Sequence, residues 1–538
     1  MILIASGAYL NTEFLSLLGR LPPSFLPVGN RRLYEWQIED LAGIEEPVFL
    51  SIPDDFQPEP DDLARLEAAG VHLLRIPPGM SLGQSVVFSI NIAEAAGGPV
   101  RILHGDTLCG PLKAHGLDVV VAGATDEYYS WAEYHHDETG RLRMTEGYPS
   151  GATPRNVLAG YFAVSDGAAL ARCISLSEFS FIGGIDLYGQ EHDLRAEHSR
   201  RWLDFGHVQT YYKSKARHTT ERAFNQLNAT PQWIEKSSDD EAKILAEAAW
   251  FEALPRELRV STPQYLGRTT DAQGRQSYRL EYLYLNTLSE IVVFGILPVY
   301  SWQRVFDLCE RFLAVSREKG PQALAEGSVP VTSAAYREKT EQRLTKFAAD
   351  TGFDLDAPCR IDGRAMPSLS RIAEEVGALV RDARTEDLGL SHGDFCFSNI
   401  FFDFRSGQIR VVDPRGRDFT GTVTPWGDMR YDVAKFMHSV LGRYDFLIAG
   451  RYRLERPASH DFALSFPSIG NNGVADFEGL FETMALAGYS PNSADLQAMM
   501  IQLFLSMLPL HYDRPDRQIA FIANALRLYA RMDQRSPA

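Results

Sequence analysis

The sequence predicts two folded parts: an α/β part with a parallel, Rossmann-like sheet at the N-terminus, followed by a two-lobed α+β part. Three observations predict this fold class. The chain has 538 residues, more than one hydrophobic core usually spans. Strand-like and helix-like segments alternate over residues 1–212. Beyond that point the pattern changes to short strands, one helix and then further helices.

The N-terminal part is predicted from its apolar periodicity. Residues 2–4 form a first strand, and residues 48–51 and 72–76 form two more. Helices are expected over 33–41 and 61–69. Strands that alternate with helices in this way are typical of a parallel sheet with right-handed crossovers.

Four segments of this part carry motifs. The loop P-P-S-F-L-P-V-G-N occupies residues 22–30, and G-Q-S occupies residues 83–85. The apolar segment V-R-I-L-H-G ends in Asp106, and W-L-D-F-G-H contains Asp204. All four occur in the order found in sugar-1-phosphate nucleotidyltransferases, which this part therefore resembles.

That resemblance implies a fold of the GT-A type and a set of site residues. It implies that Asp106 and Asp204 bind one Mg²⁺, which would align a nucleoside triphosphate with an incoming phosphate. It also implies that Gly83 and Ser85 lie where the family reads the nucleobase.

The N-terminal part departs from the family at two cationic positions. The glycine-rich loop lacks G-x-G-x-R, because Ser6-Gly7-Ala8-Tyr9 follows the first strand. Pro23 stands where a lysine is expected. Three nearby arginines are candidates to compensate: Arg20, Arg31 and Arg32. The alternative is that Asp106 and Asp204 belong to a domain used for scaffolding or effector binding.

A basic linker, residues 213–222, is expected to separate this part from a first lobe at 223–284 and a second lobe at 285–538. The first lobe should contain strands at 223–227 and 232–236 and a helix at about 239–254. Lys236 ends the second strand, and Glu247 lies on the helix.

The most informative motif lies in the second lobe. Residues 391–399 read S-H-G-D-F-C-F-S-N, and a hairpin then leads to the apolar strand I-R-V-V, which ends in Asp413. Phosphoryl transfer needs one carboxylate beside the acceptor hydroxyl and oxygen ligands for the metal ions. Asp394, Asn399 and Asp413 have the spacing of such a set, with Gly393 in place of the arginine of the protein-kinase motif.

This variant resembles the aminoglycoside phosphotransferase and choline kinase family. The resemblance implies that Asp394 is the catalytic base, that Asn399 and Asp413 bind Mg²⁺, and that Lys236 and Glu247 form the pair that holds the ATP phosphates. For Glu247, the neighbouring Glu252 is an alternative.

Two further elements match the same family. The run 278–283 resembles the strand before the hinge, so backbone groups of Glu281 and Leu283 are expected to meet adenine. Asp432, in G-D-M-R-Y-D, is expected to brace the catalytic loop. No G-x-G-x-x-G loop precedes them.

The composition excludes several classes of partner. A net charge of −17 leaves no basic stripe for nucleic acid. No apolar run is long enough to span a bilayer, and the N-terminus lacks the charged region of a signal peptide. Five scattered cysteines suit a reducing compartment, so the chain is expected to be cytoplasmic. A homo-oligomer is left open.

Together these motifs predict a bifunctional enzyme that uses Mg²⁺, ATP and a second nucleoside triphosphate. A kinase would phosphorylate a small hydroxylated substrate, and a nucleotidyltransferase would couple the ester to a nucleotide. The fusion resembles bacterial capsular polysaccharide biosynthesis proteins. Two alternatives stay open: a kinase with a degenerate N-terminal binding domain, and a pseudokinase scaffold.

Overall fold

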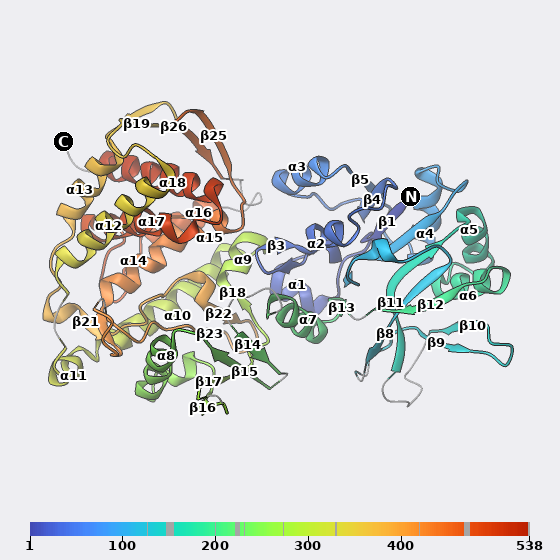
Figure 1. Cartoon of the computed structure of the whole chain (residues 1–538), viewed down its shortest axis with the longest axis horizontal. Helices are drawn as coiled ribbons and strands as arrows, with labels where there is room; N and C mark the ends of the chain where they lie inside the picture. Colours follow the sequence, from blue (N-terminus) through green and yellow to red (C-terminus); the bar gives the residue numbers. More distant parts are fainter. Residues whose placement is uncertain are drawn as a thin grey trace. The chain divides into compact units, whose positions relative to one another are not determined.

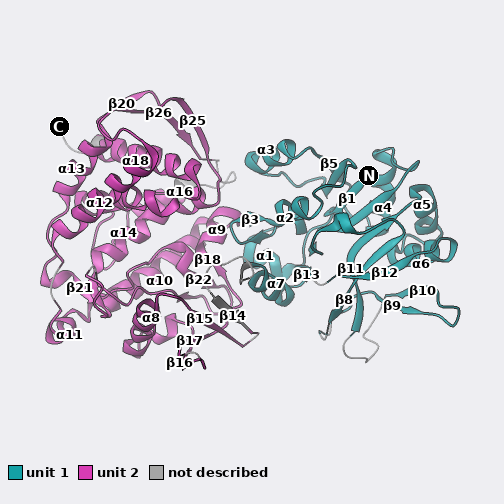
Figure 2. Ribbon diagram, in the orientation of Figure 1, with its two compact units in different colours: residues 1–221 teal, residues 222–538 magenta. Residues whose placement is uncertain are grey.

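The computed structural model describes residues 1–125, 127, 129–146, 155–199, 201–220, 226–230, 232–272, 274–328, 331–418, 420–466 and 474–535. The chain forms two compact units (Figure 1, Figure 2). Unit 1 comprises residues 1–221, and unit 2 comprises residues 222–538.

The sheet of unit 1 is parallel in one half and mixed in the other. The parallel half has the order β6-β1-β4-β5, formed by β6 (Val100–His104), β1 (Ile2–Ala5), β4 (Val48–Pro53) and β5 (Val71–Ile76). The other half joins β6 through the antiparallel β11 and consists of β11 (Arg155–Val164), β8 (Val119–Thr125), β9 (Glu133–His136), β10 (Leu142–Thr145) and β12 (Arg195–His198). The predicted α/β class is confirmed, with a parallel half where the alternation was read.

Short strand pairs and seven helices complete unit 1. The pairs are β2 (Pro27–Val28) with β3 (Arg31–Arg32), and β7 (Thr107–Leu108) with β13 (Leu203–Asp204). The helices among its described residues are α1 (Thr12–Leu18), α2 (Leu33–Asp40), α3 (Pro60–Ala68), α4 (Leu82–Ile92), α5 (Gly167–Leu176), α6 (Phe181–Glu191) and α7 (Val208–Thr220).

The linker expected at 213–222 is wrong over most of its length, because α7 continues to Thr220. The basic composition suggested an exposed connector. Instead, Tyr211 and Tyr212 bury their rings, and Ser214 donates to the carbonyl oxygen of Asp204 at 2.6 Å. These contacts fix the helix to unit 1.

Unit 2 begins with a four-stranded antiparallel sheet. Its order is β14-β15-β17-β16, formed by β14 (Gln226–Ala229), β15 (Trp233–Ser237), β17 (Gln276–Glu281) and β16 (Tyr265–Thr270). Helix α8 (Glu241–Ala253) follows β15, and Asp240 caps it by accepting from the backbone N–H of Lys243. The first strand was expected at 223–227; it is described from residue 226, and residues 223–225 lie outside the described ranges.

The second lobe is mainly helical and contains small sheets. Its helices among the described residues are α9 (Leu288–Phe294), α10 (Val299–Arg317), α11 (Gly320–Ala325), α12 (Ser333–Thr351), α13 (Leu369–Leu379), α14 (Met429–Val440), α15 (Tyr444–Ile448), α16 (Val474–Glu482), α17 (Ala494–Met507) and α18 (Pro515–Arg535). With a sheet-rich first lobe, this confirms the predicted two-lobed α+β class. No helix in the described ranges is both long and apolar enough to cross a bilayer.

Three small sheets carry the loops of the second lobe. They consist of β18 (Asn286–Thr287), β22 (Ile400–Asp403) and β23 (Gln408–Val411); β21 (Leu388–Leu390) and β24 (Trp426–Asp428); and β19 (Cys359–Ile361), β20 (Arg364–Met366), β25 (Arg453–Ala458) and β26 (Asp461–Ser465). The hairpin β22–β23 follows the S-H-G-D-F-C-F-S-N segment directly, as predicted.

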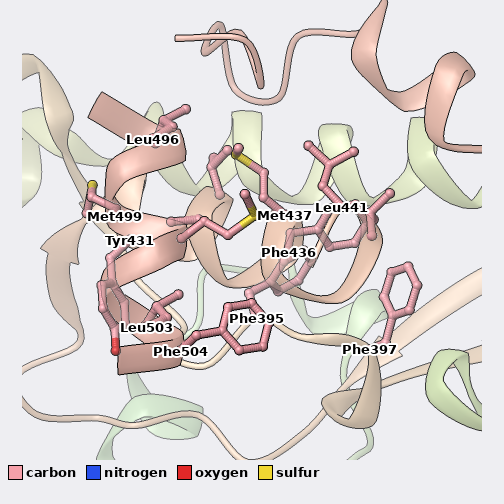
Figure 3. Close-up of a cluster of buried hydrophobic side chains, with 14 of the residues drawn as sticks. Phe395, Phe397, Tyr431, Phe436, Met437, Leu441, Leu496, Met499, Leu503 and Phe504 are labelled. Carbon is pink, nitrogen blue, oxygen red and sulfur yellow. The ribbon is translucent and has the colours of Figure 1, made fainter. Parts of the chain in front are cut away.

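Aromatic side chains anchor that segment in the core of unit 2 (Figure 3). Phe395 stacks on Phe436 of α14 with ring centroids 5.7 Å apart, and Phe397 meets the same ring edge-on at 5.3 Å. Helix α17 adds Leu503 and Phe504 to the cluster. The two phenylalanines therefore hold down both sides of Cys396, which leaves the polar residues around it for the cavity.

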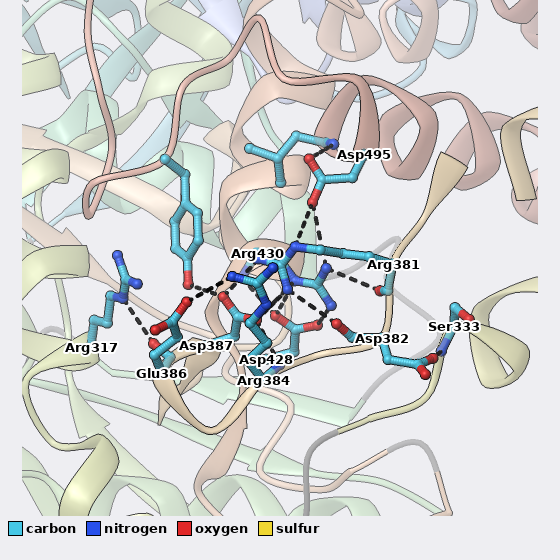
Figure 4. A network of polar contacts seen from close by, with 12 residues as sticks. Arg317, Ser333, Arg381, Asp382, Arg384, Glu386, Asp387, Asp428, Arg430 and Asp495 are labelled. Atoms are coloured by element: carbon cyan, nitrogen blue, oxygen red, sulfur yellow. Dashed lines mark hydrogen bonds and ion pairs between the residues drawn. The ribbon is translucent and has the colours of Figure 1, made fainter. Parts of the chain in front are cut away.

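A buried charge network fixes the start of α14 (Figure 4). Arg430 has a fully buried side chain and donates to Asp428 Oδ2 at 2.7 Å. Asp387 and Asp495 lie 3.8 and 3.5 Å from its guanidinium. Tyr336 of α12 donates its hydroxyl to the same oxygen, Asp428 Oδ2, 2.9 Å away. The network thus joins α12 to α14.

Replacing Arg430 with methionine keeps the length of the side chain but leaves Asp428 and Asp387 without their central cation. Breaking a buried pair in this way costs about 3–5 kcal/mol. We therefore expect unit 2 of the variant to reach half-unfolding at a lower urea concentration than the wild type. The control is Arg371→Met, because Arg371 makes its ion pairs with Glu374 and Glu375 at the surface and its loss should change little. Equal midpoints for the two variants would contradict the prediction.

Candidate functional site

The catalytic loop of unit 2 is held by the buried carboxylate of Asp432 on α14. Its Oδ2 accepts from the backbone N–H of His392 at 2.8 Å, and its Oδ1 accepts from that of Gly393 at 2.7 Å. The backbone hydrogen bonds act to lower the pKa of Asp432, but burial outweighs them and raises it to about 7. The contacts match the bracing role expected of this residue and set the direction of the chain at Asp394.

Asp394 is held by two side chains. Asn399 donates its amide to Asp394 Oδ2 at 3.0 Å, and Lys435 of α14 places Nζ 2.8 Å from Oδ1. Burial alone would raise the pKa of Asp394, but Lys435 outweighs it and the pKa is lowered. The residue is therefore a carboxylate at neutral pH, the form that can accept a hydrogen bond from a hydroxyl. Sequence reasoning assigned no role to Lys435.

Lys236 connects three elements. Its ammonium donates to Glu247 Oε2 at 2.7 Å and to Asp413 Oδ1 at 3.0 Å. Tyr278 of β17 also donates to Glu247 Oε2, at 2.7 Å. Burial lowers the pKa of Lys236, but the two carboxylates outweigh it and the pKa is raised. Glu247 therefore partners the lysine, while Glu252, the alternative, accepts from Tyr265.

The segment after Asp413 packs against both lobes. Asp413 itself has φ of 57°, a left-handed conformation that aspartate tolerates better than most residues. Gly416 has φ of 61°, and a Cβ there would lie 2.0 Å from the carbonyl oxygen of Ala246 on α8. Gly393 has φ of 75°, and a Cβ there would lie 2.6 Å from Cβ of Arg415. Both glycines permit contacts that place α8 and Arg415 beside the loop.

These residues surround one cavity of about 470 Å³. Of the residues predicted from the sequence, it brings together Lys236, Glu247, Asp394, Asn399 and Asp413. The hinge residues Glu281 and Leu283 are not among its lining residues, and the backbone N–H of Glu281 donates to Gln264 within the lobe. Their adenine-binding role stays a prediction.

The two predicted metal ligands of unit 2 fit Mg²⁺ chemically. The amide nitrogen of Asn399 donates to Asp394, so the amide oxygen is the atom that can bind a metal ion. Asp413 offers a carboxylate. Within the described ranges, no group of three or more His, Cys, Asp and Glu side chains is arranged to hold a metal ion. Mg²⁺ is usually bound through one or two carboxylates together with water and substrate phosphates.

Unit 1 brings Asp106 and Asp204 together. The pairing of β7 with β13 places them side by side, and Phe205 donates its N–H to the carbonyl oxygen of Asp106 at 2.8 Å. A Cβ on Gly206 would lie 2.4 Å from Asp106 Oδ2 and 3.5 Å from Asp204 Oδ1. Both carboxylates therefore converge on one glycine, which explains why the W-x-D-x-G segment ends in this residue type.

The electrostatics of this pair resemble those of a site that holds a cation. Burial, followed by the charge of Asp204, raises the pKa of Asp106. Asp204 is supported by the hydroxyl of Thr210 and lies 3.5 Å from Nδ1 of His207. The nearby carboxylate of Asp204 raises the pKa of His207, against the effect of burial. Two converging carboxylates suit a divalent metal ion.

The other predicted residues of unit 1 have packing roles. A Cβ on Gly83 would lie 2.2 Å from the carbonyl oxygen of Phe179, so only glycine fits there. Ser85 is buried, with its Oγ 3.2 Å from the position of a Cβ on Gly7 in the loop after β1. Their nucleobase-binding role stays a prediction.

The arginines proposed to compensate for the missing cations are engaged in other contacts. Arg31 pairs with Glu39 at 2.6 Å, and Arg32 is buried beside Asp62 at 3.4 Å. Arg20 lies over the ring of Tyr9, in the loop after β1, and pairs with Asp55 at 2.7 Å. Of the three, Arg20 is the one placed beside the loop where the family carries its cation.

Comparison with known proteins gives matches to solved structures of two kinds. No protein-family model matches the chain. No curated protein matches it. The nucleoside-diphosphate-sugar pyrophosphorylase from Vibrio cholerae RC9 is 10% identical, with 40% of this chain and 100% of that chain covered and a TM-score of 0.33. UDP-glucose pyrophosphorylase complexed with UDP-glucose is 14% identical, with 41% and 98% covered and a TM-score of 0.31.

The second kind of match is to a phosphotransferase. The GDP and kanamycin complex of APH(2")-IIia is 15% identical, with 57% of this chain and 91% of that chain covered and a TM-score of 0.33.

The raised pKa of Asp106 generates a prediction about pH. The protonated form contributes stability that is fully present below the unfolded pKa of about 4 and is lost as the pH rises through the raised folded value. Asp106→Asn should therefore unfold at a higher temperature than the wild type at pH 8 in EDTA, and the difference should shrink toward pH 4.

Scanning calorimetry across this pH range measures the effect. The control is Asp55→Asn, which changes an exposed carboxylate of the same unit and should give no such pH-dependent gain. A wild type at least as stable as Asp106→Asn at pH 8 would show that the two carboxylates do not repel each other.

Proposed function

We propose that the chain is a bifunctional enzyme: unit 2 phosphorylates a small hydroxylated metabolite, and unit 1 couples the resulting ester to a nucleotide. The observation that carries the proposal is the single cavity where Lys236 bridges Glu247 and Asp413 while Asp394 stands between Asn399 and Lys435. Carboxylates in separate cavities could not have served one triphosphate.

In the kinase step, Asp394 accepts the hydrogen bond of the acceptor hydroxyl and then its proton. The hydroxyl oxygen forms a bond to the γ-phosphorus of ATP, and the bond from that phosphorus to the leaving ADP oxygen breaks. Lys236, fixed by Glu247, binds the phosphates. Asn399 and Asp413 would hold Mg²⁺, which when bound neutralises charge on the phosphate oxygens.

In the nucleotidyltransferase step, Asp106 and Asp204 would hold Mg²⁺ beside a nucleoside triphosphate. A phosphate oxygen of the ester would attack the α-phosphorus, and pyrophosphate would leave. The product would be a nucleotide-activated metabolite for bacterial surface polysaccharide, made in the cytoplasm. The order of the two reactions supports the proposal, since the first makes the class of compound that the second consumes.

The alternative function is a kinase whose unit 1 binds a nucleotide without turning it over. The observation that favours it is the engagement of Arg31 and Arg32 by Glu39 and Asp62, because these two arginines were candidates to compensate for the missing loop arginine and for the lysine replaced by Pro23. Release of pyrophosphate separates the two functions, because only the bifunctional enzyme produces it.

Two substitutions should separate the activities. Asp394→Asn removes the carboxylate that accepts the hydroxyl proton, so ADP formation should fall roughly 10²-fold or more. Pyrophosphate release from a supplied phosphate ester should persist. Asp106→Asn should have the opposite effect, because it removes a metal ligand of unit 1 only.

Coupled assays of ADP and pyrophosphate measure both activities for each variant. Asp350→Asn, at an exposed residue that pairs with Lys346 on α12, is the matched control and should keep both. Undiminished ADP formation by Asp394→Asn would refute the kinase assignment. An absence of pyrophosphate from wild-type enzyme over a panel of esters and triphosphates would favour the alternative.

A further inference from the structure

The cavity of unit 2 is lined by more cations than acids. Three carboxylates line it: Glu247, Asp394 and Asp413. Against them stand seven lysines and arginines: Lys236, Lys243, Lys339, Arg343, Arg415, Arg417 and Lys435. A pocket of this composition attracts anions and repels cations.

The carboxylates are already paired with cations of the site. Lys236 contacts both Glu247 and Asp413, Lys243 also contacts Glu247, and Lys435 contacts Asp394. Three lysines thus balance the three carboxylates, and the other lining cations add positive charge to the cavity. These surplus cations are distinct from the lysines that pair with Glu247, Asp394 and Asp413.

Two of the surplus cations come from one helix. Lys339 and Arg343 lie one turn apart on α12, so they share a face. Helix α12 packs against α13, α17 and the short 3₁₀ segment Leu508–His511. Tyr336, at the preceding turn of α12, fixes the helix to Asp428 at the start of α14. The pair is thus presented by the helical wall of the second lobe.

The electrostatics at this wall favour an anion. Burial, and then the charges of Arg415, Arg343 and Lys435, lower the pKa of Lys339 to about 7, while Asp394 raises it. Arg343 donates to the carbonyl oxygen of Ser506 at 2.8 Å, and burial lowers its pKa as well. Cations that line one cavity repel one another, and an oxyanion between them would relieve that repulsion.

Lys339 and Arg343 come from a different part of the fold than Lys236, the lysine proposed for the ATP phosphates. Lys236 contacts Asp413 and Glu247, whereas the charges of Arg415, Arg343, Lys435 and Asp394 affect the pKa of Lys339. Lys236 and Lys243 belong to the first lobe, and Lys339 and Arg343 belong to helix α12 of the second. Asp394, the carboxylate proposed for the acceptor hydroxyl, lines the same cavity as Lys339 and Arg343.

Resting on the proposed kinase function, we propose that the acceptor carries an oxyanion, a phosphate ester or a carboxylate, which Lys339 and Arg343 bind while its hydroxyl reaches Asp394. Arginine binds carboxylate and phosphate through two parallel hydrogen bonds, and lysine adds a point charge. Polycationic acceptors such as aminoglycosides, and the quaternary ammonium of choline, are excluded by the same charges.

Matched acceptors test the proposal by ADP formation. The probes are glycerol, glycerol 3-phosphate and glycerate; glucose, glucose 6-phosphate and gluconate; and choline and kanamycin as cationic members. We expect turnover with phosphorylated or carboxylated members and none with choline or kanamycin. Preference for phosphates over carboxylates, or the reverse, identifies the source of the oxyanion. Turnover confined to neutral or cationic members would overturn the proposal.

Variants of α12 locate the binding site. Lys339→Gln and Arg343→Gln should each raise KM for the anionic acceptor roughly 10-fold or more, with a smaller change in kcat, because each removes one charge-assisted contact. Lys346→Gln is the matched control, since Lys346 lies on the same helix, is exposed and pairs with Asp350. Unchanged KM in both α12 variants would overturn the proposal.

A binding measurement separates this inference from the kinase function. With the Mg²⁺ complex of the ATP analogue AMPPNP present, inorganic phosphate should raise the unfolding temperature of the wild type and of Lys346→Gln, but not of Lys339→Gln or Arg343→Gln, at constant ionic strength. Equal protection of all four proteins, or of none, would overturn the inference. Failure of the kinase function shows itself differently, as no ADP from any probe while phosphate still protects the wild type.

Discussion

The site of unit 2 depends on one ammonium group held by two carboxylates. Lys236 comes from a strand of the first lobe, Glu247 from the helix after it, and Asp413 from the end of a strand in the second lobe. Because Lys236 and Glu247 are buried, separating them would leave an uncompensated buried charge. The ion pairs therefore couple the folding of the first lobe to the geometry of the loop that carries Asp413, and Gly416 against Ala246 gives that coupling a steric contact.

A second network of buried charges fixes the helices that line the other side of the cavity. Arg430 and Asp428 fix the start of α14, and Tyr336 joins α12 to them. From these anchors the two helices present Lys435 and Lys339 toward Asp394. The hydrophobic core beneath the catalytic loop supplies rigidity, while these buried charges set the register of the helices that carry the site. Catalytic groups need this kind of support to remain within reach of one another.

Site residues that lie close together in the sequence could be predicted from it. Those that separate helices bring to the cavity could not. Asp394, Asn399 and Asp413 could be found from their spacing, because one hairpin brings them together. Lys435 and Lys339 carry no such signal, since only the packing of α12 and α14 brings them to the cavity. The linker was misread for a related reason: basic residues on a helix were taken for an exposed connector, although neighbouring tyrosines bury its other face.

One contact described above also constrains how this sequence can change over time. Gly393 stands where protein kinases carry an arginine, and the stem of Arg415 fills the space that a side chain there would need. A larger residue at 393 would collide with Arg415 and would also occupy an unfavourable backbone conformation. Accepting a side chain at 393 would therefore require both a change at Arg415 and a strained backbone.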